Sequence, residues 1–280
     1  MHLALKSAMS RIPYTNKVGE TLGSIADPAA AYSLRALNGG DPMVARVRRS
    51  SDDAERDFTA SDVSGGALVD WVGSGNDGFV ATWYDQLGND NHATQSTAGS
   101  QPKIVDGGVY LGELVFDVNA EDYLEMPPVS GRTIYALCSA NTADTGTNPR
   151  GLMSSNLATS SGASYIFFSP NAGPYNSYAA SLDGQANDQA SWYLNGDHKG
   201  SGGNIGTYGD VLSGQTMLHS FEYSVGYPTN DWRVLGAYFT TGATYKGLDG
   251  SIQEVIIYNS DQSSNRTAIE TNINNHYDIY

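Results

Sequence analysis

The sequence predicts an all-β fold, a β-sandwich or jelly roll, and three observations lead to this prediction. Short apolar runs alternate with turn signals along the chain, glycine is abundant with 32 of 280 residues, and only 16% of the residues are charged. Glycine, asparagine, aspartate and serine serve turns, whereas aromatic and β-branched residues favour strands. Many short strands with little helix are typical of sandwiches, and this length suffices to bury one large core.

The apolar runs that we expect to form strands follow one another through most of the chain. Their ranges are 45–51, 78–85, 113–118, 132–140, 164–170, 190–194, 216–224, 232–239 and 251–259. In the second of these runs, strict alternation would place Phe79 and Trp83 on one face and Val80 and Tyr84 on the other. Asn195 and Gly196 give the strongest hairpin signal, because both central residues of a type I′ turn need a positive φ.

We expect two helices. The segment 29–37 follows Asp27 and Pro28, which are a good N-cap and first-turn pair. Near the end of the chain, Ile269, Ile273 and Tyr277 recur every four residues. This spacing predicts a helix with one apolar stripe against the body of the protein.

The first 27 residues differ in charge and in sequence pattern from the rest of the chain. They carry three lysines and arginines against two acids, on a chain whose net charge is -15. We therefore expect an N-terminal arm at 1–27, serving anchoring or oligomerisation, followed by one sandwich domain at 28–280. A floppy terminus is the alternative.

Charge and cysteine content exclude several classes of protein. A net charge of -15 repels phosphate backbones, so nucleic acid is not an expected partner. Cys138 is the only cysteine, which rules out an intramolecular disulfide, and its apolar surroundings favour a small buried hydrophobe over a nucleophile. No segment is long and apolar enough to span a membrane. The five histidines are scattered without the spacing of zinc ligands.

The stretch 81–95, ATWYDQLGNDNHATQ, concentrates polar side chains. Asp85 and Asn89 can cap backbone N–H groups of a turn in which Gly88 supplies a positive φ. His92 and Gln95 can then bond buried backbone where the chain re-enters the core. The residues assigned to this structural turn are Tyr84, Asp85, Gln86, Asn89 and His92. The alternative is a calcium site built from Asp85, Asn89 and Asp90, since calcium prefers clustered oxygens; otherwise we expect no cofactor and no metal.

A family resemblance is carried by the first third of the chain. The positions concerned are Arg49, Ser51, Asp52, Asp53, Tyr84, Asp85, Gln86, Gly88, Asn89, His92 and Gln95. In their order and spacing they resemble the fungal α-L-arabinofuranosidase B-type catalytic domain. The last tenth, from Gly247 to Tyr277, resembles the final strand and helix of laminin-G and concanavalin A-like sandwiches. The resemblance implies a concanavalin A-like jelly roll with a short N-terminal arm and a C-terminal helix, in which the Tyr-Asp-Gln stretch is scaffold.

The same module also resembles structural proteins of tailed phages and bacterial surface proteins. This implies a non-enzymatic structural protein of a phage virion, such as a capsid decoration, head fibre or tail fibre component. Its partners would be other virion proteins, bound through the arm, further copies of itself, and a glycan at the host surface. Two alternatives stay open: an active α-L-arabinofuranosidase, and a secreted or cell-surface lectin-like domain.

The resemblance also indicates where catalysis would reside. It places the family's nucleophilic Glu in a segment that matches 161–170, which holds no carboxylate, and the acid/base Asp at 238–241, where Tyr, Phe, Thr and Thr stand. The family's adjacent cysteine pair cannot form with one cysteine. We therefore expect no hydrolase activity, since a retaining glycosidase needs two carboxyl groups. Asp183, Glu222 and Asp249 are the carboxylates that could substitute.

Trp192, Tyr193 and Tyr208 are the candidate carbohydrate-binding residues, because exposed aromatic rings stack on sugar faces. The alternative, which the burial habits of aromatic residues favour, is that Trp192 and Tyr193 fill strand faces. Glu222 is expected on the solvent face of its strand. The cluster RVRRSSDD, at 46–53, is expected to form a local network of salt bridges at a strand end.

Overall fold

The computed structural model describes residues 21–141, 150–155, 165–168, 179–181, 190–201, 214–223, 230–240 and 244–280. Its strands pair antiparallel throughout, as an all-β sandwich requires. The helices are α1 (Leu22–Ile25), α2 (Ala60–Ser64), α3 (Ala67–Val72) and α4 (Arg266–Tyr277). The strands of the first half are β1 (Ala30–Ser33), β2 (Met43–Arg49), β3 (Glu55–Thr59), β4 (Gly78–Trp83), β5 (Ala93–Thr94), β6 (Lys103–Asp106), β7 (Val109–Phe116), β8 (Leu124–Gly131) and β9 (Thr133–Ala140). Those of the second half are β10 (Arg150–Ser154), β11 (Tyr165–Phe168), β12 (Ala179–Ser181), β13 (Ala190–Leu194), β14 (Asp197–Ser201), β15 (Met217–Tyr223), β16 (Asn230–Leu235), β17 (Ala237–Thr240), β18 (Thr244–Gly247) and β19 (Gly250–Tyr258).

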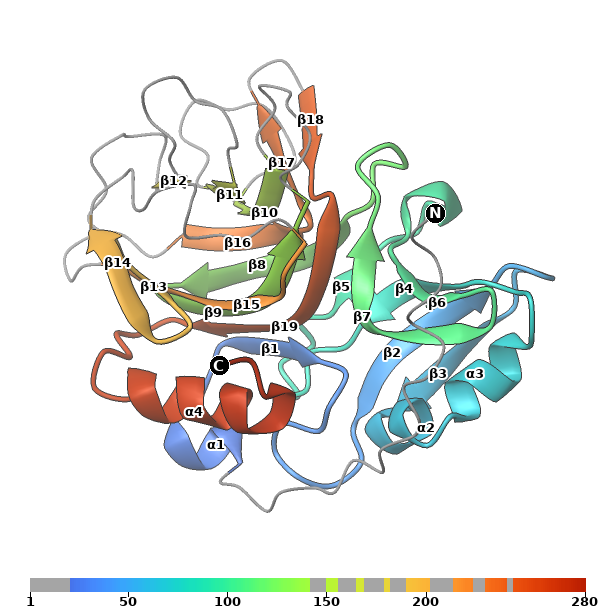
Figure 1. Cartoon of the computed structure of the whole chain (residues 1–280), viewed down its shortest axis with the longest axis horizontal. Helices are drawn as coiled ribbons and strands as arrows, with labels where there is room; N and C mark the ends of the chain where they lie inside the picture. Colours follow the sequence, from blue (N-terminus) through green and yellow to red (C-terminus); the bar gives the residue numbers. More distant parts are fainter. Residues whose placement is uncertain are drawn as a thin grey trace.

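Two layers of strands form the sandwich. In one layer β14, β13, β15, β9, β19 and β1 are neighbours in this order. The other layer contains β8, β16, β10, β11 and β12. Figure 1 shows β8, β16 and β10 stacked over β9 and β15, with α4 on the outer face of the first layer. From β19 the pairing also continues through β7, β6, β4, β2 and β3, beside which α2 and α3 lie.

Strand β9 shows why its sequence is a continuous apolar run. All eight of its residues are buried, and they alternate between two cores. Ile134, Ala136 and Cys138 face the core between the two layers, whereas Tyr135 and Leu137 face the smaller core beneath α4. A strand that is covered on both faces has no position for a solvated side chain. The sequence of β9 is therefore a continuous apolar run and does not alternate between apolar and polar residues.

The helix expected at 29–37 is wrong. Residues 30–33 form the buried strand β1, which pairs with β19 in the register Ala30↔Ile257 and Ser33↔Glu254. Tyr32 enters the main core and Ala31 the core beneath α4. The alanine-rich sequence has good helix propensity, but a helix would present only one face to each neighbour. Pairing with β19 and burial on both faces outweigh the weak intrinsic preference.

The short helices α2 and α3 were not expected from the sequence. A reciprocal capping box starts α2, in which the Thr59 hydroxyl accepts from the N–H of Asp62, and the Asp62 carboxylate accepts from the N–H of Thr59. Gly66, with φ of +91°, separates the two helices. The sequence signal was thus a capping box with Asp at the position that more often holds Glu or Gln.

Three other expectations are confirmed, for helix α4, for the hairpin at Asn195 and for Cys138. Helix α4 buries Ile269 and Ile273 against the sandwich. Asn195 and Gly196 connect β13 to β14 with φ of 50° and 83°, as a type I′ hairpin requires. Cys138 is buried, and burial raises the pKa of its thiol well above the ordinary value. Among the described residues, no helix is long and apolar enough to cross a membrane.

The described part of the expected N-terminal arm, residues 21–27, packs against the sandwich. Leu22 is fully buried in the core beneath α4, and its N–H donates to the carbonyl of Leu37 at 3.0 Å. An arm that ends at Asp27 would include this core residue. Leu22 therefore belongs to the body of the sandwich, and the rest of the expected arm, residues 1–20, lies outside the described residues.

Candidate functional site

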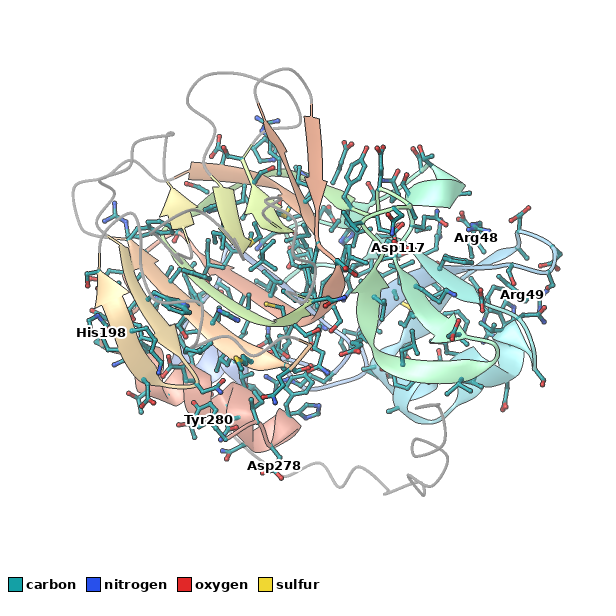
Figure 2. The ribbon with its side chains drawn as sticks, turned by 45° about the horizontal axis from the view of Figure 1, so that its top comes forward. Arg48, Arg49, Asp117, His198, Asp278 and Tyr280 are labelled. Atoms are coloured by element: carbon teal, nitrogen blue, oxygen red, sulfur yellow. The ribbon has the colours of Figure 1, made fainter. Side chains whose placement is uncertain are left out.

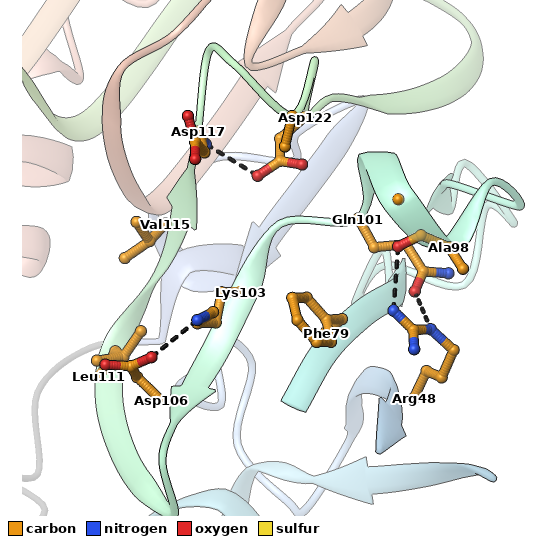
Figure 3. A pocket seen from close by; sticks show the side chains of 12 residues that line it. Arg48, Phe79, Ala98, Gln101, Lys103, Asp106, Leu111, Val115, Asp117 and Asp122 are labelled. Atoms are coloured by element: carbon orange, nitrogen blue, oxygen red, sulfur yellow. Dashed lines mark hydrogen bonds and ion pairs between the residues drawn. The ribbon is translucent and has the colours of Figure 1, made fainter. Parts of the chain in front are cut away.

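A cavity of about 700 Å³ opens beside β4, β6 and β7 (Figure 3). Its lining residues are Arg48, Phe79, Ala98, Gly99, Gln101, Lys103, Asp106, Leu111, Val115, Asp117, Ala120 and Asp122. The floor follows one line of register across four strands, because Arg48 pairs with Phe79, Phe79 with Lys103, and Lys103 with Val115. The walls come from the short 3-10 helix Ala98–Ser100 and the turn 117–122.

A β-bulge in β4 turns Phe79 toward the cavity. The register against β2 is Arg46↔Thr82 and then Val47↔Val80, so Ala81 is the extra residue. Strict alternation would have placed Phe79 and Trp83 on the same face. The bulge separates them, so that Trp83 is fully buried in the main core and Phe79 remains partly exposed in the cavity. Bulges commonly redirect a side chain in this way.

Two cationic side chains flank the Phe79 ring, and both are held in place. The Arg48 guanidinium carbon lies 4.8 Å and the Lys103 ammonium 5.7 Å from the ring centroid, with Phe79 between them in Figure 3. Arg48 donates to Asp53 at 2.8 Å, to the Gln101 side chain at 2.7 Å and to a backbone carbonyl at 3.0 Å. Lys103 forms ion pairs with Asp106 at 2.8 Å and Asp77 at 3.0 Å.

Carboxylates occupy the opposite wall of the cavity. The Asp117 N–H donates to the Asp122 carboxylate at 2.8 Å, and Asp117 itself accepts from the N–H and side-chain amide of Asn119. The turn is closed by Glu121 at φ of 56°. Asp122 is buried, and this burial raises the pKa of its carboxyl to about 6. Asp106 and Asp117 are exposed at the rim.

The turn after β4 is bound mainly to backbone. The buried Asp85 carboxylate accepts from the N–H of Ala31 at 3.0 Å and of Leu87 at 3.3 Å. The Asp85 N–H donates to Nδ1 of His92 at 3.1 Å. Burial raises the pKa of the Asp85 carboxyl. These contacts tie β1 to the end of β4, over 54 residues of sequence.

The other residues assigned to the turn make similar contacts. Gln86 donates to the carbonyls of Ser33 and Arg35, and accepts from the N–H of Leu37. Asn89 donates to the carbonyl of Ala29 at 3.3 Å. The Tyr84 hydroxyl donates to Asp57 at 2.6 Å, and its ring meets that of His92 edge to face. Gln95 bonds the carbonyl of Tyr123 and the N–H of Thr97.

The alternative calcium site is not assembled by this geometry. Asp85 directs one oxygen at two backbone N–H groups, while Asp90 is exposed, with its nearest carboxylate oxygen 3.7 Å from Nε2 of His92. Within the described ranges, no group of three His, Cys, Asp or Glu residues is arranged to hold a metal ion.

The three aromatic candidates for sugar stacking are not brought together. Trp192 is fully buried, with its ring 6.0 Å from that of His219, so its assignment to an exposed sugar site is wrong. Tyr193 is partly exposed, but the Arg266 guanidinium carbon lies only 3.7 Å from its ring centroid and covers one face. Tyr208 lies outside the described residues.

The positions that the resemblance assigns to catalysis cannot be assembled from the described side chains, because those of 161–165, 167–170 and 238–241 lie outside them, as does Asp183. Of the carboxylates that could substitute, Glu222 is half-buried under α4, contrary to the solvent-facing position expected for it. Its carboxylate lies 3.4 Å from Nε of Arg266, and burial raises its pKa. Asp249 is half-buried next to β19.

The residues that line the cavity were largely missed by sequence reasoning. The expected salt bridges in RVRRSSDD do form, between Arg48 and Asp53 at 2.8 Å and between Arg49 and Asp52 at 2.6 Å. This cluster was the only sequence signal near the cavity, and it did not indicate that Phe79 or Lys103 lies beside Arg48. Figure 2 shows Arg48 and Asp117 away from His198 across the molecule, and the ring of His198 lies 5.0 Å from that of Tyr193, one of the aromatic residues that were selected.

No protein-family profile and no curated protein matches the sequence. The fold, however, is similar to those of solved GH54 α-L-arabinofuranosidases. One, soaked with a cyclic sulfate inhibitor, aligns with a TM-score of 0.55 and 15% identity; a Glu-to-Gln mutant soaked with 4-nitrophenyl α-L-arabinofuranoside aligns with 0.51 and 14%. An arabinofuranosidase in complex with arabinofuranosyl-α-1,2-xylobiose aligns with 0.50 and 15%. Each alignment covers 88% of this chain and 62% of the other. The chain therefore has an arabinofuranosidase-like β-sandwich fold and spans less than two thirds of the length of these enzymes.

Proposed function

We propose that this protein binds carbohydrate, and that the cavity around Phe79 is the binding site. The observation that carries the proposal is a partly exposed aromatic ring at the floor of a cavity whose rim holds carboxylates. The C–H face of a sugar ring is apolar and packs on an aromatic ring, while its hydroxyl groups need hydrogen-bond partners at the edge. The volume of about 700 Å³ lies within the range of ligand sites.

The likeness of the fold to arabinofuranosidases supports the proposal without identifying the sugar. A β-sandwich of this kind can hold either a binding site or an active site, so the function must be argued from the side chains. In the cavity, Gln101 and the two cations are already fixed by their own hydrogen bonds. A site that is organised before the ligand arrives loses less entropy on binding.

The test is a binding titration with soluble oligosaccharides, including arabino-oligosaccharides, followed by calorimetry or by NMR. Phe79→Ala should lower the affinity of the bound sugar by about tenfold or more, which corresponds to about 1.4 kcal/mol. Tyr280→Ala is the matched control, because Tyr280 is an exposed aromatic residue, with 53% of its surface accessible, that does not line the cavity. Equal affinities in the wild type and Phe79→Ala would refute the cavity as the site.

Glycoside hydrolysis is the second candidate function, and the likeness to GH54 enzymes is the observation that favours it. We propose that the chain does not hydrolyse arabinofuranosides, because the segments that resemble the catalytic positions lack carboxylates in the sequence. Incubation with 4-nitrophenyl α-L-arabinofuranoside checks this. Turnover that is abolished by Glu222→Gln or Asp183→Asn would overturn the proposal.

A place in a phage particle is a further proposal, and it rests on the sequence resemblance and on the locally basic segment 1–20. Mass spectrometry of purified particles from the source would detect the chain and give its copy number. A variant that lacks residues 1–20 keeps Leu22 and the core beneath α4, so it should fold. If it still joins the particle, the segment is not the anchor.

A further inference from the structure

The cavity contains more negative charge than its two cations can balance. Arg48 and Lys103 face three carboxylates in the lining, Asp106, Asp117 and Asp122. Two further carboxylates outside the lining, Asp53 and Asp77, form ion pairs with these cations. Two cations thus meet five carboxylates within one region of a chain whose net charge is already -15.

Both cations are also committed to partners inside the protein. The guanidinium of Arg48 donates through Nε, Nη1 and Nη2 to separate acceptors. Gln101, one of these acceptors, is buried and is itself fixed because its amide donates to the carbonyl of Gln95 at 2.8 Å. Asp77, which holds Lys103, accepts in addition from the N–H of Gly107 at 2.8 Å. An anionic ligand would find only the N–H groups that these contacts leave over, next to carboxylates that already neutralise both cations.

The exposed groups of the rim, in contrast, are hydrogen-bond acceptors. Asp106 and Asp117 are exposed, and a carboxylate accepts hydrogen bonds without donating any. The remaining lining is small or apolar, from Ala98 and Gly99 to Leu111 and Val115. A ligand that fits this surface presents an apolar face to Phe79 and hydrogen-bond donors to the rim.

We infer that the cavity selects uncharged or amine-bearing sugar units and rejects sugars that carry a carboxylate, such as uronic and sialic acids. The inference rests on the proposed function, because it names the class of sugar for the same site. Sugar hydroxyls and ammonium groups donate to Asp106 and Asp117, whereas a sugar carboxylate meets like charge in a partly desolvated cavity, which opposes binding.

The experiment measures binding of matched pairs: glucose with glucuronic acid oligomers, and galactose with galacturonic acid oligomers, each at low and high salt. In a pair that binds, the affinity for the neutral oligosaccharide should be at least about tenfold higher than the affinity for the acidic one. High salt should reduce this ratio of affinities, because salt screens the repulsion of the sugar carboxylate. Asp117→Asn should also reduce the ratio. Asp197→Asn is the matched control, since it removes the same charge from an 82% exposed side chain on β14, outside the cavity, and it should leave the ratio unchanged.

The outcomes separate the two proposals. Phe79-dependent binding in which the acidic sugar is equal or tighter overturns the selectivity and leaves carbohydrate binding at the cavity in place. A preference for the neutral sugar that Asp117→Asn and Asp197→Asn change equally also overturns it, because a general field of the protein would then be the cause. Absence of Phe79-dependent binding for every sugar overturns the proposed function, and the selectivity with it.

Discussion

Replacement of Asp85 by alanine tests the reading of the polar stretch after β4 as a structural turn. The substitution removes the acceptor of two backbone N–H groups, those of Ala31 at 3.0 Å and of Leu87 at 3.3 Å. The first is buried within the sheet, where water cannot replace the lost partner. A buried donor left without an acceptor costs about 1–3 kcal/mol, and the second, longer bond adds up to about 1 kcal/mol. We expect a loss of about 2–3 kcal/mol of unfolding free energy.

Urea unfolding and thermal melting measure this loss. Unfolding of 280 residues carries an entropy of about 0.6 kcal/mol/K near 60 °C, so the melting temperature should fall by about 3–5 °C. Asp85→Asn is the control, because the amide oxygen can still accept from both N–H groups, and it should lie within about 1 kcal/mol of the wild type. Calcium should not change the melting temperature of the wild type.

Two results would refute this reasoning. If Asp85→Ala unfolds like the wild type, the hydrogen bond to Ala31 does not hold β1 in place. If calcium raises the melting temperature of the wild type strongly, and Asp85→Ala abolishes that rise, the carboxylate is a metal ligand and the alternative reading of the stretch is correct.

Two further substitutions test the cavity wall and the core. Asp122 has its pKa raised to about 6 by burial, against about 3.9 when unfolded, so the stability that its protonated form contributes is present below pH ~4 and is lost as the pH rises through ~6. Asp122→Asn should remove this dependence of the unfolding free energy on pH. With solvent access from the cavity allowed for, it should also raise the unfolding free energy at pH 7 by about 1–2 kcal/mol. Urea unfolding at pH 4 to 7 measures both effects, and an unchanged dependence on pH would contradict the burial of Asp122. Gly236 and Gly88 have similar positive φ angles, 81° and 75°, but a methyl group at Gly236 would meet the Phe116 ring, whereas one at Gly88 would meet open space. Gly88→Ala should therefore lower the unfolding free energy by about 1 kcal/mol, and Gly236→Ala by far more. Equal melting temperatures of the two variants would contradict the packing around Gly236.

Several strands of this fold, among them β4, β9, β15 and β19, could be predicted because their signal is local. Apolar runs, turn residues and the four-residue spacing of Ile269, Ile273 and Tyr277 are read within one segment. The failure at 29–37 has a different origin. Whether Ala30 to Ser33 is a helix or a strand is decided by β19, which follows more than 200 residues later in the chain. Tertiary pairing overrides propensity in such a segment, and no local pattern shows the partner.

The cavity could not be predicted for the same reason, with one addition. Its floor joins Arg48, Phe79, Lys103 and Val115 through the register of four strands. That register depends on the bulge at Ala81, which moves Phe79 to the face opposite Trp83. A shift of one residue reverses the faces of a strand, so the strict alternation assumed from the sequence placed the two rings together. Of the aromatic residues that the sequence offered instead, Trp192 belongs to the core, as the alternative reading of this residue expected.

Strand β4 and the turn after it therefore have two separable roles. Asp85 fixes the end of the strand to β1, while Phe79, six residues earlier and about 20 Å away along an extended strand, faces the cavity. Loosening the turn should leave the cross-strand row of Arg48 and Lys103 in place, because β2 and β6 hold it independently of β1. Asp85→Ala should then lose stability and keep sugar affinity, whereas Phe79→Ala, which removes a partly exposed ring, should lose affinity at a small cost in stability. If both substitutions lower affinity in proportion to stability, the cavity is merely sensitive to unfolding and the ring is not a contact for the sugar.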